Sequence, residues 1–233
     1  MERGLRRLLT TLRRIIDNGR YAVVANDIGA VHAMDGMPFI AGPHLNIYNT
    51  PTLELFATLG ATRWVMPLEM GRAGLAKLLQ EKPARLETEV FAYGRMPLAF
   101  SARCFTARHR NLPKDNCEFS CMDHSDGLLL QTREKSDFLV LNGIQTQSAK
   151  VCNLVDELAA MQAIGVDTVR ISPQAQHNER IIALFDQVRH GRMVPTAAMT
   201  ALQQWMPDQP CNGYWNGEPG MHQMEQALQF GDR

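Results

Sequence analysis

The chain has 233 residues, of which 45% are hydrophobic, and this length can bury a sizeable core in one or two domains. Its 24 Lys and Arg residues balance 24 Asp and Glu residues, so the formal net charge at pH 7 is zero. A neutral chain lacks the global positive field that gathers nucleic acid or an anionic membrane, and neither partner is expected. No apolar run approaches the roughly 18 residues of a membrane span, so no transmembrane helix is expected.

The cysteine count favours free thiols over disulfides. Five cysteines cannot all pair, and a chain of this length does not need a disulfide framework. No short apolar segment with a cleavage site opens the chain, so no secretory signal is predicted. A cytoplasmic location is therefore expected, where reduced thiols are available as metal ligands.

The first twenty residues predict an amphipathic helix. Leucines and isoleucines recur with the helical period, and Asn18-Gly19 supplies a stop. Six arginines in this segment are interpreted as the solvated face of a packed helix. A transit peptide or a membrane-surface helix is the alternative.

Strand-like and helix-like segments then alternate. Strands are predicted at residues 22–25, 38–41, 63–68, 86–92, 138–142 and 167–171. Helices are predicted at residues 50–59, 73–80, 154–164 and 181–188, the first opened by Thr50-Pro51. Such alternation favours a parallel sheet covered by helices.

The predicted fold is α/β, a TIM-barrel-like parallel β/α structure forming a single domain over residues 1–233. A complete barrel has eight strands in about 250 residues. Six strands are predicted here, and the chain opens on a helix. We therefore expect a barrel that is incomplete at its N-terminus or is closed by other elements.

Residues 94–131 interrupt the alternation. They show no clear period, contain Pro97 and Pro113, and hold three of the five cysteines. A segment of this length without regular structure is usually functional or disordered, and the cysteines argue against disorder. We predict that residues 94–131 form an irregular, cluster-binding insertion.

The spacing of Cys104, Cys117 and Cys121 is the most informative motif. Iron–sulfur clusters and structural zinc both need several thiolates that converge from irregular backbone. The absence of a CxxC pair weakens the zinc-ribbon reading, and small buried residues are the remaining alternative. Cations nearby would favour the thiolate form, namely Arg103, Arg108, Arg110 and Lys114.

Polar residues follow several predicted strands. In a β/α barrel the residues just after the strands line the active face. An ordinary polar loop is the alternative for each of them. The residues selected by this rule are Asn26, Asp27, His44, Asn46, Glu69, Tyr93, Asn142 and Ser172.

The cysteine segment resembles the UbiV branch of the collagenase-like peptidase family, a branch that acts in ubiquinone biosynthesis. The resemblance is carried by residues 101–108 and 113–121, and it continues through residues 89–94, 141–146 and 211–215. It covers nearly the whole chain from the first helix onward. Pro97, in place of a cysteine, and the extra Cys117 both fit this branch and not its sisters.

The resemblance implies a barrel-like fold and a 4Fe–4S cluster held by Cys104, Cys117 and Cys121. It also implies a heterodimer with a UbiU-like paralogue, acting on a ubiquinone precursor as a component of an oxygen-independent hydroxylase. Sister branches include presumed peptidases and RNA-modification factors, and both stay as alternative functions. No HExxH, GxSxG or P-loop motif supports a peptidase or an NTPase. A non-catalytic partner with a structural cluster is a further alternative.

The fourth cluster ligand is open. Relatives in this branch take it from a cysteine near the N-terminus, and no cysteine precedes Cys104 here. We expect a shortened start of the chain for this reason. Cys152 and a residue of the partner are the other candidates, whereas Cys211 is expected to be structural.

Overall fold

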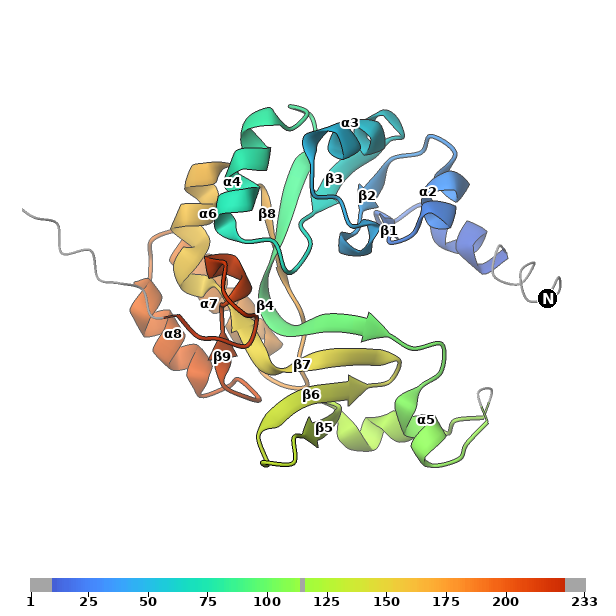
Figure 1. Ribbon diagram of the computed structural model, residues 1–233, viewed down its shortest axis with the longest axis vertical. Helices are drawn as coiled ribbons and strands as arrows, with labels where there is room; N and C mark the ends of the chain where they lie inside the picture. Colours follow the sequence, from blue (N-terminus) through green and yellow to red (C-terminus); the bar gives the residue numbers. More distant parts are fainter. Residues whose placement is uncertain (1–9, 114–115, 225–233) are drawn as a thin grey trace, which may run out of the picture. The chain divides into compact units, whose positions relative to one another are not determined.

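A computed structural model describes residues 10–113 and 116–224. The chain is a mixed α/β protein (Figure 1). It divides into two compact units, which are described separately. Unit 1 comprises Met1–Phe91 and Met161–Arg170, and unit 2 comprises Ala92–Ala160 and Ile171–Arg233. Of the first twenty residues, predicted to form a helix, residues 10–16 are helical, residues 17–20 form a turn and a bend, and residues 1–9 lie outside the described residues.

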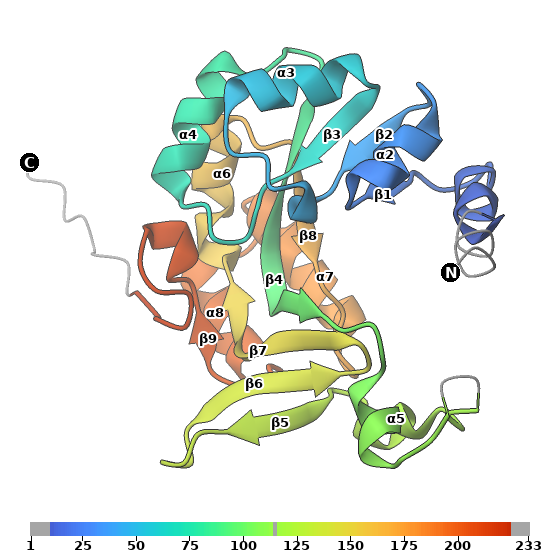
Figure 2. The same cartoon turned by 45° about the vertical axis from the view of Figure 1, so that its right-hand side comes forward.

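Unit 1 is built on a parallel sheet. β1, β2, β3 and the first half of β4 pair side by side in that order, and β8 also pairs with β4. Figure 2 shows α3 and α4 on the same side of β3. The strands are β1 (Val24–Ala25), β2 (Phe39–Ala41), β3 (Ala61–Val65), β4 (Glu87–Phe100) and β8 (Thr168–Ile171). The helices are α2 (Ile28–Met34), η1 (Pro43–Leu45), α3 (Thr50–Thr58), α4 (Arg72–Glu81) and the end of α6 (Leu158–Ile164).

The helices of unit 1 follow from local sequence. Asn49, not Thr50, caps α3, because its side chain accepts the backbone N–H of Thr52 at 2.9 Å. Proline in the first turn suits the helix start. One face of α3 buries Leu53 and Phe56. Burial of each such side chain contributes about 1.5–3 kcal/mol.

A charge network joins three strands of unit 1. The carboxylate of Glu89, only 4% exposed, is paired with Arg63 Nη1 at 3.2 Å and with Arg170 Nε. Arg63 also pairs with Glu87 at 2.7 Å. Glu89 is therefore a buried charge with two partners, as a stable interior requires.

Unit 2 is built on an antiparallel sheet. The second half of β4 pairs with β7, β7 with β6, and β6 with β5, while β9 runs parallel to β7. Figure 2 shows β5, β6 and β7 side by side. The strands are β5 (Leu128–Gln131), β6 (Asp137–Asn142), β7 (Gln145–Asn153) and β9 (Pro210–Cys211). The helices are α5 (Phe105–His109), η2 (Ser120–His124), η3 (Val155–Glu157), the start of α6, α7 (Asn178–Arg189), α8 (Pro195–Gln203) and η4 (Tyr214–Asn216).

The sequence predicted most of unit 1 and less of unit 2. All six predicted strands are present, and the four predicted helices overlap α3, α4, α6 and α7. The expectation of an entirely parallel sheet is wrong, because β6 pairs antiparallel with both β5 and β7. Residues 94–131, expected to be irregular, hold the end of β4 together with α5, η2 and β5.

The membrane prediction agrees with the helices that the structure describes. Among residues 10–113 and 116–224, no helix has both the length and the apolar character needed to cross a bilayer.

Candidate functional site

The cysteine segment is anchored on the turn between β6 and β7. The backbone N–H groups of Ser101 and Phe105 donate to the carbonyls of Ile144 and Gly143, each at 2.7 Å. α5 contacts both β6 and η2. Cys104 is the residue that precedes α5, so these contacts fix its backbone at the turn.

The second half of the segment returns through Cys117 and Cys121. The Cys117 carbonyl accepts the N–H of Ser120 at 3.2 Å, and Cys121 lies in η2. An ion pair of 2.8 Å joins Arg110, at the end of α5, to Asp123 in η2. The two halves of the segment are therefore tied together at their α5 and η2 ends.

The backbone between Cys117 and Cys121 is strained. Glu118 and Phe119 have φ of 54° and 48°, in the left-handed region. This conformation costs an L-residue roughly 1–2 kcal/mol. Strain of this kind concentrates in segments that bind ligands or change conformation.

All three predicted cluster cysteines are free and half-buried. Among the side chains of residues 10–113 and 116–224, no group of three His, Cys, Asp or Glu is arranged to hold a metal ion. The donor set still fits an iron–sulfur cluster in kind, because three accessible thiols share one short segment. Cluster binding would require Cys104, Cys117 and Cys121 to be drawn together.

Cys152 and Cys211 are a separate pair. They are register partners in β7 and β9, and both are buried. Burial raises the pKa of the Cys152 thiol well above its usual value, and it raises the pKa of Cys211 to about 11. Both therefore stay protonated at neutral pH, unlike metal-ligating thiolates.

Cys152 is also remote from the cluster segment. Cys104 lies at the β6–β7 turn, where β7 begins at Gln145. Seven residues separate Gln145 from Cys152, a path of at most about 23 Å at about 3.3 Å each, because β7 has register shifts against β4. Cys152 pairs with Gly94 and Cys211 at the end of β7 opposite that turn. The geometry of unit 2 thus argues against Cys152 as the fourth cluster ligand.

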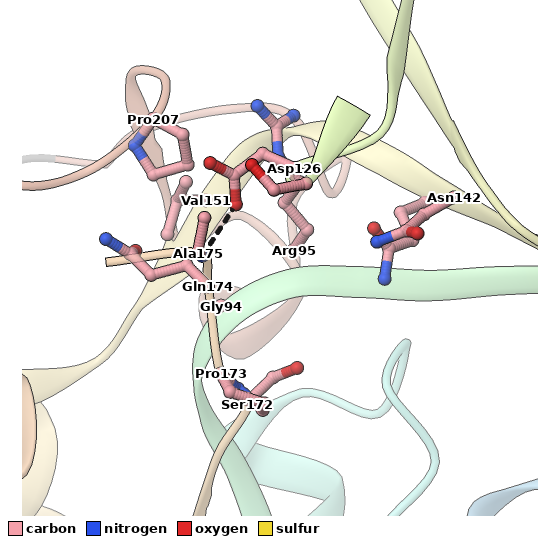
Figure 3. Close-up of a pocket in the computed structure, with 12 residues that line it drawn as sticks. Gly94, Arg95, Asp126, Asn142, Val151, Ser172, Pro173, Gln174, Ala175 and Pro207 are labelled. Carbon is pink, nitrogen blue, oxygen red and sulfur yellow. Dashed lines mark hydrogen bonds between the residues drawn. The ribbon is translucent and has the colours of Figure 1, made fainter. Parts of the chain in front are cut away.

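A polar cavity of about 250 Å³ lies in unit 2 (Figure 3). Its walls come from the bend in β4, the residues after η2, the facing strands β6 and β7, and the loop after β8. The lining includes Gly94, Arg95, Asp126, Asn142, Ser172 and Ala175.

Gly94 lets the loop after β8 approach β4. Its φ is +119°, and a Cβ at this position would lie 2.6 Å from Ser172 Cβ. The preceding Tyr93 donates its hydroxyl to Gln174 Oε1 at 3.0 Å. Desolvation raises the pKa of Tyr93, so the hydroxyl keeps its proton for this bond.

Arg95 brings a positive charge to the cavity. Its Nη1 donates to the carbonyls of Ser148 and Ala149. Its Nε is buried and has no hydrogen-bond partner in the described part of the chain. Desolvation lowers the pKa of Arg95, which remains a cation, and three carboxylates oppose this shift, namely Asp208, Asp126 and Asp137.

Asp126 connects the cavity to the cysteine segment. It follows η2, and its Oδ1 accepts the N–H of Ala175, in the loop after β8, at 2.8 Å. Figure 3 shows this bond beside Arg95. The cysteine segment therefore continues directly into one wall of the cavity.

The rule that residues just after barrel strands line the active face identified two of the cavity residues. Asn142 and Ser172 line the cavity, and Tyr93 supports it through Gln174. The other selected residues lie in unit 1, namely Asn26, Asp27, His44, Asn46 and Glu69.

Two of those unit 1 residues make local contacts that account for their polar side chains. Asp27 caps α2 by accepting the N–H of Ala30 at 3.0 Å. Glu69 accepts the hydroxyl of Tyr48, whose pKa is raised to about 12 by desolvation and by that carboxylate. The rule about strand ends did not select Arg95 or Asp126. An arginine inside an apolar strand is a signal that could have identified Arg95.

The sequence of the chain is similar to those of known proteins. The chain matches the profile of Peptidase family U32 over residues 1–224, and it belongs to that family. It is 23% identical over 124 residues to tRNA hydroxylation protein P of Escherichia coli (strain K12). That similarity covers 50% of this chain and 27% of the relative, so the aligned part spans about a quarter of the relative's length. No solved structure matches the chain.

Proposed function

We propose that the chain is an iron–sulfur protein that supports hydroxylation of a ubiquinone precursor without dioxygen, as the partner of a UbiU-like paralogue. The observation that carries the proposal is the placement of three free, half-buried thiols in a segment that continues into the wall of a polar cavity. Membership of family U32 and similarity to a hydroxylation protein support a hydroxylation role. We also propose that the chain folds as part of a β/α barrel.

Cys104, Cys117 and Cys121 would hold a 4Fe–4S cluster. Such a cluster supplies one-electron transfer, with a potential set by its hydrogen bonds and exposure. The residues of the chain position the segment: the Arg110–Asp123 pair ties its two halves, and Asp126 fixes its end to the loop after β8. The fourth iron would take a ligand from the partner, from a small molecule or from an upstream residue.

Hydroxylation of RNA is the second candidate function. It is favoured by the relative, which is a tRNA hydroxylation protein. The zero net charge of the chain favours a small-molecule substrate instead, because RNA binding is driven by basic surface. The family name also suggests a peptidase, for which the sequence offers no motif.

The cluster can be tested by anaerobic reconstitution. We expect broad visible absorption that dithionite bleaches, and loss of most bound iron in Cys104→Ala, Cys117→Ala and Cys121→Ala, because a cluster corner without its thiolate is labile. Cys211→Ala is the matched control and should keep its iron. Equal iron in all four variants would show that the ligand assignment is wrong.

The substrate can be tested by deleting the gene in its host. Anaerobic growth followed by quinone analysis should show loss of ubiquinone, while tRNA hydroxylation measured by mass spectrometry should be unchanged. The opposite pattern would establish the RNA candidate and reject the quinone candidate.

A further inference from the structure

We infer that the cavity of unit 2 binds a small zwitterion of the α-amino acid type, with Arg95 facing its carboxylate and Asp126 facing its ammonium group. Both residues line the cavity, and Figure 3 shows them on the same side of it. The inference concerns a ligand of the chain, and it does not depend on the cluster.

The two charges share a cavity without forming an ion pair. In the described part of the chain no ion pair joins Arg95 to Asp126, and Arg95 Nε is buried without a hydrogen-bond partner. Asp126 uses Oδ1 for the Ala175 N–H, which leaves Oδ2 as an acceptor. A cation and an anion held apart in a pocket match a ligand that carries both opposite charges.

The surrounding charges favour a zwitterion over a dianion. Asp137 and Asp208 act electrostatically on Arg95 in addition to Asp126. Asp126 lines the cavity itself, and a carboxylate there disfavours a second negative charge on the ligand and favours an ammonium group. A ligand with only an ammonium group would leave the charge of Arg95 without a partner on the ligand, and a ligand with only a carboxylate would do the same for Asp126.

The remaining lining sets the ligand's size. The cavity of about 250 Å³ lies below the roughly 300–1,000 Å³ of pockets for drug-sized molecules, so the ligand is small. Asn142 and Ser172 offer polar groups across the cavity from Arg95. Val151, Pro173 and Pro207 add an apolar wall, which suits an aliphatic side chain.

Isothermal titration calorimetry on the full chain tests the inference with three probes of matched shape. L-Leucine carries both charges, isocaproate only the carboxylate, and isoamylamine only the ammonium group. We expect leucine to bind at least about tenfold more tightly than either analogue, because each charge-assisted hydrogen bond contributes to affinity. Failure of leucine to bind, or equal binding of leucine and isocaproate, would overturn the inference.

Two variants assign the roles of the residues. Arg95→Gln should lower leucine affinity to that of isoamylamine, and Asp126→Asn, which keeps an acceptor for Ala175, should lower it to that of isocaproate. The exposed turn residues Arg133 and Glu134 provide matched controls, and Arg133→Gln and Glu134→Gln should bind leucine unchanged. If Arg95→Gln does not fold, the probe series on the natural chain and Asp126→Asn still decide. The preference for leucine over the two analogues should be the same before and after reconstitution of the cluster, because this inference does not depend on the cluster.

Discussion

At the scale of single residues, the five cysteines differ in what surrounds their sulfur atoms. Cys104, Cys117 and Cys121 are half-buried, whereas Cys152 and Cys211 are buried with raised pKa values. In the cluster-free folded protein at neutral pH, iodoacetamide should therefore modify the first three and spare the other two, because the thiolate is the reactive form. Peptide mass spectrometry of native and urea-unfolded protein measures this pattern. Equal modification of Cys152 in the native protein would contradict the burial described above.

The two buried thiols, Cys152 and Cys211, affect the stability of the fold at alkaline pH. A thiol whose pKa is raised by folding keeps its proton in the folded state after the unfolded chain has lost it. The free energy of unfolding should therefore decrease as the pH rises from the usual cysteine value of 9.0 toward about 11, the value of Cys211. Cys211→Ala should reduce this decrease.

Gly94 and Gly143 allow a matched test of close packing. Both have positive φ, but a Cβ at Gly94 would lie 2.6 Å from Ser172 Cβ, whereas a Cβ at Gly143 would meet no atom of a non-neighbouring residue within 4 Å. Gly143→Ala should cost about 1 kcal/mol for the backbone alone. Gly94→Ala should cost about 2–4 kcal/mol, because the loop after β8 must also shift. Urea denaturation measures both costs, and equal values would show that the loop moves freely.

At the scale of elements, periodicity was sufficient where strands are buried and apolar. β1, β2 and β3 are short, and the helices α3 and α4 that flank β3 were predicted, whereas α2, after β1, was missed. β7 was missed because Gln145–Asn153 is largely polar and has no apolar alternation to mark it. The extension of β4 to Phe100 was missed because Gly94 and Pro97 suggest a break. Register shifts next to Pro97 show how a strand accommodates proline.

The candidate site was predicted to a similar degree. The rule that strand ends line the active face found Asn142 and Ser172, because that rule depends only on where strands stop. Arg95 and Asp126 could not be paired from sequence, since they are 31 positions apart and meet only through the antiparallel strands that were not predicted. Spacing identified the cysteines as one group, but it could not show that Cys152 lies far along β7 from the turn.

At the scale of the whole molecule, the two units share elements. β4 crosses from unit 1 to unit 2 between Phe91 and Ala92, and α6 and β8 also contain a boundary. Unfolding of one unit would therefore break hydrogen bonds inside continuous strands and a helix that the other unit uses. We expect a single cooperative unfolding transition.

Tryptophan fluorescence can test this cooperativity unit by unit. Trp64 is buried in unit 1, while Trp205 and Trp215 belong to unit 2. Trp64→Phe leaves only the unit 2 reporters, and the double change Trp205→Phe with Trp215→Phe leaves only Trp64. Within each variant, the Tm from fluorescence should equal the Tm from far-ultraviolet circular dichroism, because dichroism reports both units. A fluorescence Tm that differs from the dichroism Tm in either variant would mean that the units unfold separately, with β4 unable to couple them.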